Sequence, residues 1–116
     1  MPSIAITLAL HIVSEANARE HWRVVAKRKA THRVIARTML QKYARPNPQP
    51  ITVVLTRIGK KTLDSDNLQS GFKATRDGVA DWIGIDDGSP LLTWRYAQAK
   101  GKQYAAHVSV TWGLDS

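Results

Sequence analysis

The acidic residues of this chain gather in one short stretch of an otherwise basic sequence. Six of the nine acids lie between positions 64 and 87, whereas 15 of the 17 Lys and Arg residues lie outside that stretch. The six acids are Asp64, Asp66, Asp77, Asp81, Asp86 and Asp87. A basic surface attracts a polyanion, but clustered carboxylates repel one unless a divalent cation lies between them. The pattern therefore predicts a metal-dependent enzyme that acts on nucleic acid.

Two pairs of carboxylates bracket this acidic stretch. Asp64 and Asp66 are separated by one residue, so their side chains can point the same way in an extended or turning segment. Asp86 and Asp87 lie in a short segment bracketed by glycines. Hard divalent cations prefer carboxylate oxygens, and a bound ion can activate water and stabilise charge on a phosphate. The structural alternative is that Asp66 only caps a helix and that residues 86–88 only form a turn.

The helix expected between the two pairs creates a distance problem for a single site. An α-helix of about 16–18 residues spans roughly 24–27 Å, which would hold the pairs far apart. One solution is a helix that is shorter, or broken near Gly78. The other is a dimer in which the first pair of one subunit meets the second pair of its partner. The residues alone leave both solutions open.

Apolar, partly β-branched segments predict four strands. These strands are expected near residues 3–13, 51–58, 91–99 and 104–112. Three prolines between positions 46 and 50 end the preceding helical pattern and favour an extended connector. Lys100-Gly101-Lys102 predicts a hairpin turn between the last two strands.

Two helices are predicted between these strands. Residues 15–44 contain no Gly or Pro and separate an apolar from a basic face, which predicts one long helix or two with a break near 29–31. A second helix should be capped by Asp66 or Asn67 and run to about Ile83, with an apolar face opposite a polar one. The buried face is expected to comprise Leu68, Phe72, Thr75, Val79, Trp82 and Ile83.

The element order is therefore β-α-β-α-β-β. This order predicts a single α+β domain over residues 1–116, with helices packed on one face of a mostly antiparallel four-stranded sheet. The chain has no cysteine, which excludes disulfides and thiolate metal sites. It also has no apolar run of membrane-spanning length and no signal-peptide pattern, so we expect a cytoplasmic protein.

A net charge of +8 and a pI near 10.2 favour a nucleic-acid partner over an anionic membrane surface. Nine Lys and Arg residues lie between positions 19 and 45, against one acid, so the polar face of the first helix could follow a phosphate backbone. Two more lysines directly precede the acidic stretch. The candidate DNA-binding residues are Arg19, Arg23, Lys27, Arg33, Arg37, Lys60 and Lys61.

The aromatic residues and histidines are expected to be structural. The four histidines have no metal-ligand spacing. Trp22 and Trp82 fall on apolar helix faces, while Trp94 and Trp112 lie in predicted strands. Core packing is therefore expected for Trp22 and Trp82, and packing in the core or at a dimer interface for Trp94 and Trp112, rather than stacking on opened bases.

The segments Leu63-Asp64-Ser65-Asp66-Asn67-Leu68-Gln69 and Ile85-Asp86-Asp87 resemble the RusA family of Holliday junction resolvases. The family signature is an Asp-x-Asp-Asn-Leu segment, a helix, and an Asp-Asp pair about twenty residues further on. Here Asp66 and Asp87 are 21 residues apart. The likeness is sharp over residues 64–88 and weaker over the rest of the chain.

The resemblance implies a small homodimer that resolves four-way DNA junctions by paired nicks, typically in bacteria or their phages. It implies Mg²⁺ as the cofactor, with Mn²⁺ as an alternative ion. By position, Asp64, Asp66 and Asp87 match the metal-binding catalytic aspartates of the family, and Asp86 would assist them.

One position departs from the family pattern. Resolvases of this family carry a catalytic lysine four residues after the second aspartate, where this chain has Ser70. Lys73 lies one turn further along the same helix face and could deliver its ammonium to a similar place. Its structural alternative is an i,i+4 ion pair with Asp77. A non-catalytic basic module that binds nucleic acid remains the alternative function.

Overall fold

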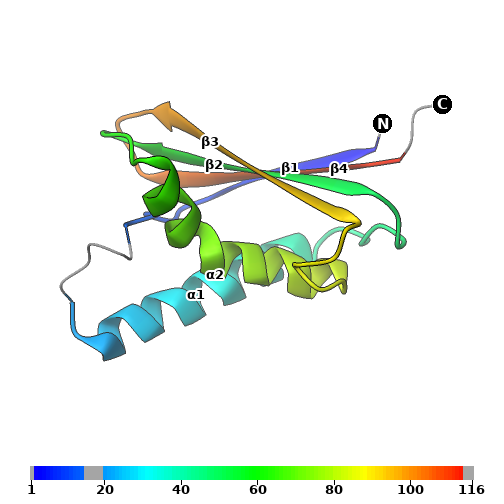
Figure 1. Ribbon diagram of the computed structural model, residues 1–116, viewed down its shortest axis with the longest axis horizontal. Helices are drawn as coiled ribbons and strands as arrows, with labels where there is room; N and C mark the ends of the chain where they lie inside the picture. Colours follow the sequence, from blue (N-terminus) through cyan, green and yellow to red (C-terminus); the bar gives the residue numbers. More distant parts are fainter. Residues whose placement is uncertain (1, 15–19, 114–116) are drawn as a thin grey trace.

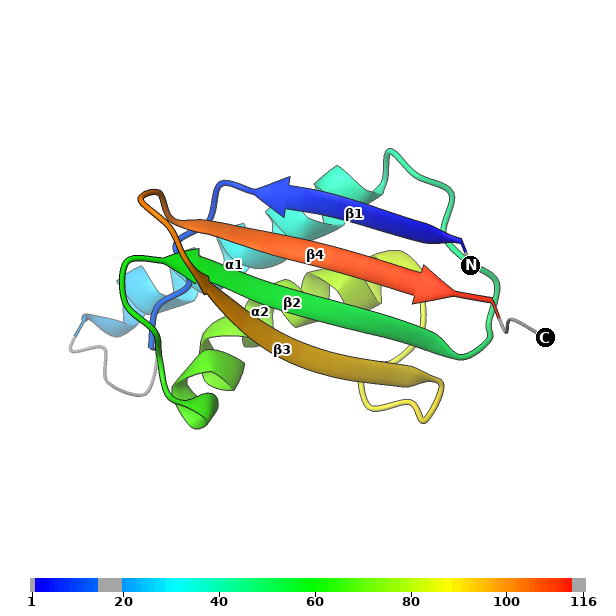
Figure 2. The ribbon, with the colours of Figure 1, turned by 90° about the horizontal axis from the view of Figure 1, so that it is seen from above.

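The strand segment with the strongest apolar pattern, β2 (Ile51–Gly59), lies inside a four-stranded sheet, and its side chains alternate between buried and half-buried. The structure is a computed structural model that describes residues 2–14 and 20–113. The other elements are β1 (Ser3–Leu8), α1 (Trp22–Leu40), α2 (Ser65–Ile83), β3 (Leu92–Lys100) and β4 (Ala105–Trp112). Both helices lie on one face of the sheet (Figures 1 and 2). The predicted element order and α+β class are confirmed.

The sheet has the strand order β1-β4-β2-β3. β4 pairs antiparallel with β1 and with β2, whereas β2 and β3 are parallel. The sheet is therefore mixed, with its one parallel pair in the β2-α2-β3 unit. This unit carries the acidic stretch, since α2 and the loop after it connect the two parallel strands (Figure 2).

The predicted hairpin between the last two strands is wrong. β3 and β4 lie on opposite sides of β2, so the loop between them crosses the end of β2. The amide of Gly101 donates to the carbonyl of Gly59 at 3.0 Å. A Cβ on Gly101 would lie 2.7 Å from the side chain of Ile58, so this glycine allows the crossing loop to approach closely.

The first helix is shorter than predicted, at 19 residues, and only its C-terminal half is anchored in the core. Ala36 and Leu40 are fully buried. In contrast, Trp22 is 68 % exposed and Val24 is 50 % exposed. The expectation that Trp22 packs in the core is wrong, because the first turns of α1 extend beyond the sheet (Figure 2).

The second helix has the predicted buried face, and all six of the residues expected there are buried. Its predicted N-cap, Asp66 or Asn67, is wrong by two to three residues. Asp64 is the N-cap, and its carboxylate accepts a hydrogen bond from the amide of Asn67 at 3.0 Å. Gly84 ends the helix in the left-handed conformation, with φ of 79°, as a C-cap glycine does.

The second helix is continuous at Gly78, where a break was considered. A Cβ there would collide with the carbonyl oxygen of Arg33, so Gly78 lets α1 and α2 pack closely. The helix instead bends in its N-terminal half (Figure 1). We attribute the bend to Ser70-Gly71, because the Ser70 hydroxyl donates to the carbonyl of Asn67 at 3.2 Å, and such bonds bend helices. Neither helix of the described ranges is long and apolar enough to cross a membrane.

Candidate functional site

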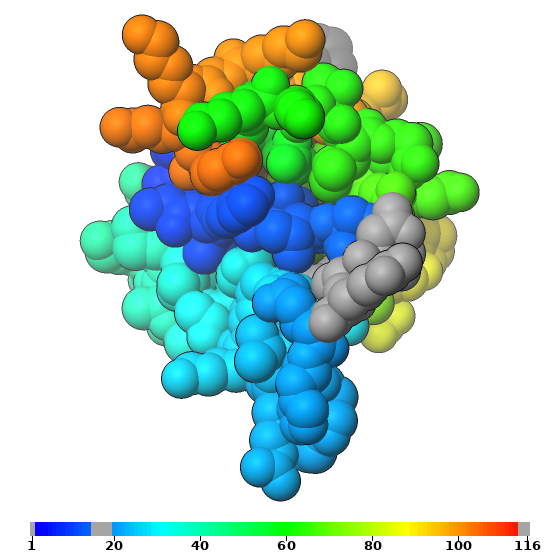
Figure 3. Space-filling view, turned by 90° about the vertical axis from the view of Figure 1, so that its left-hand side faces the viewer, coloured from blue at the N-terminus to red at the C-terminus, as the bar shows by residue number. Residues whose placement is uncertain are grey.

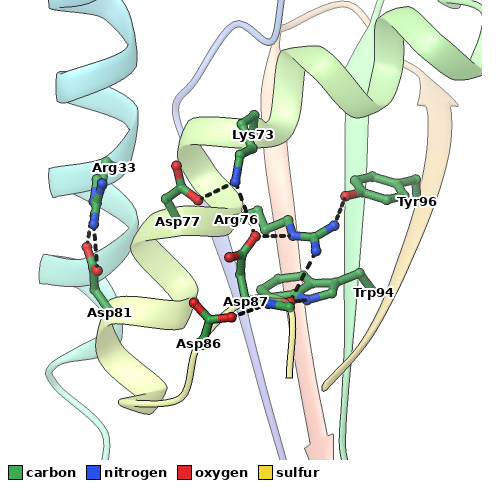
Figure 4. Close-up of polar contacts among 10 residues, drawn as sticks. Arg33, Lys73, Arg76, Asp77, Asp81, Asp86, Asp87, Trp94 and Tyr96 are labelled. Carbon is green, nitrogen blue, oxygen red and sulfur yellow. Dashed lines mark hydrogen bonds and ion pairs between the residues drawn. The ribbon is translucent and has the colours of Figure 1, made fainter. Parts of the chain in front are cut away.

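The loop after α2 folds back, so that Asp87 lies beside the middle of the helix (Figure 4). Its Oδ2 atom is 3.1 Å from Lys73 Nζ and 3.1 Å from Arg76 Nε. Lys73 precedes Asp87 by 14 residues, so this contact requires the chain to reverse direction after Gly84. The second acidic pair is therefore much nearer the start of α2 than the full length of the helix would suggest.

The backbone of Asp87 is held as firmly as its side chain. Arg76 donates a second hydrogen bond to the carbonyl of Asp87 at 3.1 Å, and the Trp94 indole donates to the same carbonyl at 2.8 Å. The guanidinium of Arg76 lies 4.7 Å from the Trp94 ring centroid and also donates to the Tyr96 hydroxyl at 3.0 Å. Arg76 of α2 and Trp94 and Tyr96 of β3 thus form a clamp that holds the loop residue Asp87 between α2 and β3 (Figure 4).

Lys73 contacts two carboxylates at once. Its Nζ atom is 2.9 Å from Asp77, the predicted i,i+4 partner, and 3.1 Å from Asp87. The hydrogen bond that Lys73 donates to Asp77, and to a lesser extent the one that it donates to Asp87, raises the pKa of Lys73. Lys73 in turn lowers the pKa of Asp87 below its ordinary value of 3.8. The lysine is therefore charged and Asp87 ionised at neutral pH.

An acidic pocket of about 410 Å³ lies between the C-terminal half of α2 and the loop after it. Asp77, Asp81, Asp86 and Asp87 line it together with Arg33 of α1. Asp86 turns one oxygen toward the amide of Gly88 at 3.0 Å. The structure thus gathers four of the six acids of the stretch around one pocket.

Asp81 is engaged across the helix pair. Its two oxygens accept hydrogen bonds from Arg33 at 2.7 and 2.8 Å, and Arg37 lies 3.9 Å away. The hydrogen bond from Arg33 lowers the pKa of Asp81, and Asp81 raises that of Arg33. Two arginines that the sequence assigned to DNA therefore face a carboxylate, and their role in DNA binding stays a prediction.

The first acidic pair lies at the start of α2, apart from this pocket. Asp64 caps the helix, and Asp66 is exposed in its first turn. Seven residues separate Asp66 from Lys73, which corresponds to at most about 10 Å along the helix. Across residues 2–14 and 20–113, no three His, Asp or Glu side chains are grouped so that they alone could hold a metal ion.

A second, basic pocket adjoins Lys73 on the side of the helix bend. Ser70 and Lys73 line this pocket of about 330 Å³ together with Lys29, Gln69, Arg76 and Tyr96. Ser70, at the position of the family lysine, and Lys73 therefore border the same space. Lys29 of α1 also faces this region, although the sequence alone did not single it out.

The remaining DNA-binding candidates lie on separate parts of the surface. Arg19 falls outside the described residues. Arg23 and Lys27 are exposed on the first turns of α1. Lys60 borders a pocket with Lys100 and Lys102 at the end of the sheet, and the carbonyl of Lys61 accepts from the buried Arg57. Lys100, at the end of β3, and Lys102, in the loop that follows, extend the predicted basic surface.

The clamp is the main part of the site that sequence reasoning missed. Arg76 is one of only two Lys and Arg residues inside the acidic stretch. Its position among acids was the feature of the sequence that could have indicated a contact with one of them. Trp94 was expected in the core or an interface, and it is half-buried with its indole bonded to the loop.

Comparison with known proteins identifies no relative of this chain among family models or curated proteins.

Proposed function

We propose that this protein is a Mg²⁺-dependent, structure-selective endodeoxyribonuclease that resolves four-way DNA junctions by paired nicks, acting as a homodimer. The observation that carries the proposal is the 3.1 Å contact between Lys73 and Asp87. The resemblance to RusA resolvases requires a lysine close to the catalytic aspartates, and Ser70 occupies the family position. Lys73 supports the proposal because it offers an ammonium beside the last of these aspartates.

The donor set suits a hard cation, since all four candidate ligands are carboxylates. Asp64, Asp66 and Asp87 would hold Mg²⁺ or Mn²⁺, with Asp86 assisting. Magnesium typically takes one or two protein carboxylates and completes its shell with water and substrate phosphate. Two separated acidic pairs are compatible with such binding if DNA or a partner subunit completes the site. A bound ion would supply an activated water and stabilise charge on the phosphate.

The other residues have roles that follow from their positions. Lys73 would neutralise charge on the phosphate as the bond breaks, which requires it to leave Asp77 or Asp87 in part. Arg76 and Trp94 hold Asp87 in place through its side chain and its carbonyl. The basic pocket beside Ser70, with Lys29, would take the backbone of the strand to be cut. Two subunits would present two such sites and place symmetric nicks.

The test compares Asp66→Asn and Asp87→Asn with the wild type on a synthetic four-way junction. We expect each substitution to lower cleavage in Mg²⁺ by at least about hundredfold, because a ligand charge is lost. Junction binding should be retained or become tighter, since removal of a carboxylate reduces repulsion of DNA. Unchanged cleavage by both variants, with binding intact, would refute the assignment.

A non-catalytic basic module is the second candidate, and one observation favours it. Asp64, Asp86 and Asp87 each have protein partners: an amide for Asp64 and Asp86, and two cations for Asp87. Such contacts are what caps and turns require. This function predicts binding that EDTA does not alter and that is equally tight for linear and branched DNA. It also predicts that Asp64→Ala costs about 1 kcal/mol of stability through loss of the cap.

A further inference from the structure

Trp22 is the largest apolar side chain that the fold leaves in solvent. It is the first residue of α1 and is 68 % exposed. Full burial of a tryptophan removes roughly 150–250 Å² from water, so a fold that exposes one forgoes a large stabilising contribution. The first turns of α1 stand out from the body of the molecule (Figure 3). The side chain is thus displayed on a projection, where it can contact a partner.

The surroundings of Trp22 are cationic. The Arg23 guanidinium carbon lies 5.3 Å from the centroid of the indole ring, and the His21 ring is 5.5 Å away at a tilt of 31°. Lys27 is exposed one turn after Arg23. The neighbouring acid in the chain, Glu20, is paired with Arg28 at 2.7 Å. An aromatic ring with a cation over one face, and a second cation one turn further along the helix, is complementary to a nucleotide, which presents a flat base next to a phosphate.

We propose that Trp22 is a stacking platform for an unpaired base of DNA, with Arg23 and Lys27 holding the adjoining phosphates. The inference rests on the proposed action on DNA, and it adds a preference for strands whose bases are opened. Bases within an intact duplex are stacked on one another and offer no free face, whereas those at a branch point or in a single strand do. Trp22 would therefore contribute to selectivity for structure rather than sequence.

The test measures binding of three DNAs in Mg²⁺-free buffer: a four-way junction, a single-stranded oligonucleotide and a blunt duplex. Trp22→Ala should weaken binding of the junction and the single strand by about tenfold, which is the scale of one lost base–aromatic stack. Binding of the duplex should change by less than about twofold. Trp22→Phe should keep most of the affinity, because a ring remains. The dependence of binding on salt should not change, since no charge is removed.

Val34→Ala is the matched control, because Val34 is an exposed apolar residue of the same helix, at 47 %, away from the projecting turns. This substitution should leave all three affinities unchanged. Circular dichroism of each variant confirms that α1 remains folded. The tryptophan emission that Trp22→Phe removes should be quenched in the wild type by the single strand and not by the duplex.

The outcomes separate this inference from the function on which it rests. If the wild type binds and cleaves junctions, and Trp22→Ala does both equally well, the stacking role is refuted while the nuclease stands. Loss of a dimer in Trp22→Ala, with equal weakening for all three DNAs, assigns the tryptophan to a second copy of the chain and also refutes it. A wild type that binds none of the DNAs overturns both proposals.

Discussion

Lys73 lies one helical turn beyond Ser70, the position at which the resembled family carries its catalytic lysine. Both residues border the same basic pocket, and Lys73 reaches two carboxylates from there. Its raised pKa keeps the ammonium charged across the neutral range. If this charge acts on the phosphate in the transition state, its removal should lower the cleavage rate more than the affinity for the junction.

Lys73→Met should lower the rate of junction cleavage by about hundredfold, because a positioned charge is lost from the transition state. Junction affinity should fall only severalfold, as expected for one phosphate contact. Adding Ser70→Lys to this variant should restore part of the rate, since it recreates the family arrangement. Single-turnover cleavage measures the rate separately from binding. If Lys73→Met leaves the cleavage rate unchanged, Lys73 has no catalytic role and only forms its ion pairs with Asp77 and Asp87.

Arg76 is a positioning residue, because it acts through Asp87. Arg76→Lys keeps the charge but cannot make the hydrogen bonds to the side chain, the carbonyl and Tyr96 together. We expect kcat to fall about tenfold with little change in KM, and the Mg²⁺ concentration for half-maximal rate to rise. Hydrogen exchange in residues 84–88 should accelerate and the emission of Trp94 should shift. A fall in kcat/KM that comes only from a higher KM, with kcat unchanged, would contradict this role.

The residue types of the site could be predicted from sequence, but their partners could only partly be predicted. The Asp64-x-Asp66 and Asp86-Asp87 pairs and Lys73 were visible as a pattern of charges. The clamp on Asp87 was not, because one of its acceptors is a backbone carbonyl, which leaves no mark on the sequence. The position of Asp87 beside Lys73 could not be predicted either. It requires the chain to reverse direction after Gly84, and the tertiary contacts of the clamp hold that reversal in place.

The contact between α1 and α2, called here the joint between the helices, combines close backbone packing with one charged pair. Gly78 allows the helices to approach, and Asp81 accepts a two-pronged hydrogen bond from Arg33. The pKa of Asp81 is lowered by this pairing. Because the joint forms one wall of the acidic pocket, its stability affects the geometry of the site.

The lowered pKa of Asp81 makes the stability of the joint dependent on pH. A carboxylate whose pKa is lower in the folded state contributes its full stability above the ordinary value of 3.8, and loses it as the pH falls through the folded value. Asp81→Asn should therefore destabilise the protein at pH 7 by up to about 1 kcal/mol, because the pair is partly exposed. Urea unfolding should show that the difference from the wild type shrinks below pH ~3.8. A difference that stays constant down to pH ~2 would contradict the ion-pair origin.

Periodicity predicted which elements form and which faces they bury, since apolar spacing reports these directly. It did not predict which strands are neighbours: β3 and β4 are consecutive, yet β2 lies between them. It also could not show whether anything covers an apolar face. Trp22 lies on the apolar side of α1, but α1 extends past the sheet at that point, so the tryptophan remains exposed.

Acidic and basic surfaces of the protein meet at α2. The acidic pocket lies on one side of Lys73 and the basic pocket on the other, while further lysines lie at the end of the sheet. A net charge of +8 favours an anionic partner, and the proposed nuclease would use the exposed carboxylates to hold a cation. The dimer proposed from the resemblance would place two such boundaries between an acidic and a basic surface on one DNA molecule.

Cleavage of a strand-labelled four-way junction by the purified wild type, in Mg²⁺ and in EDTA, tests the nuclease proposal most directly. We predict nicks on two opposed strands in Mg²⁺ or Mn²⁺, none in EDTA, and none on linear duplex of the same sequence. A folded protein that binds the junction but leaves every branched substrate intact in both metals would contradict the proposal.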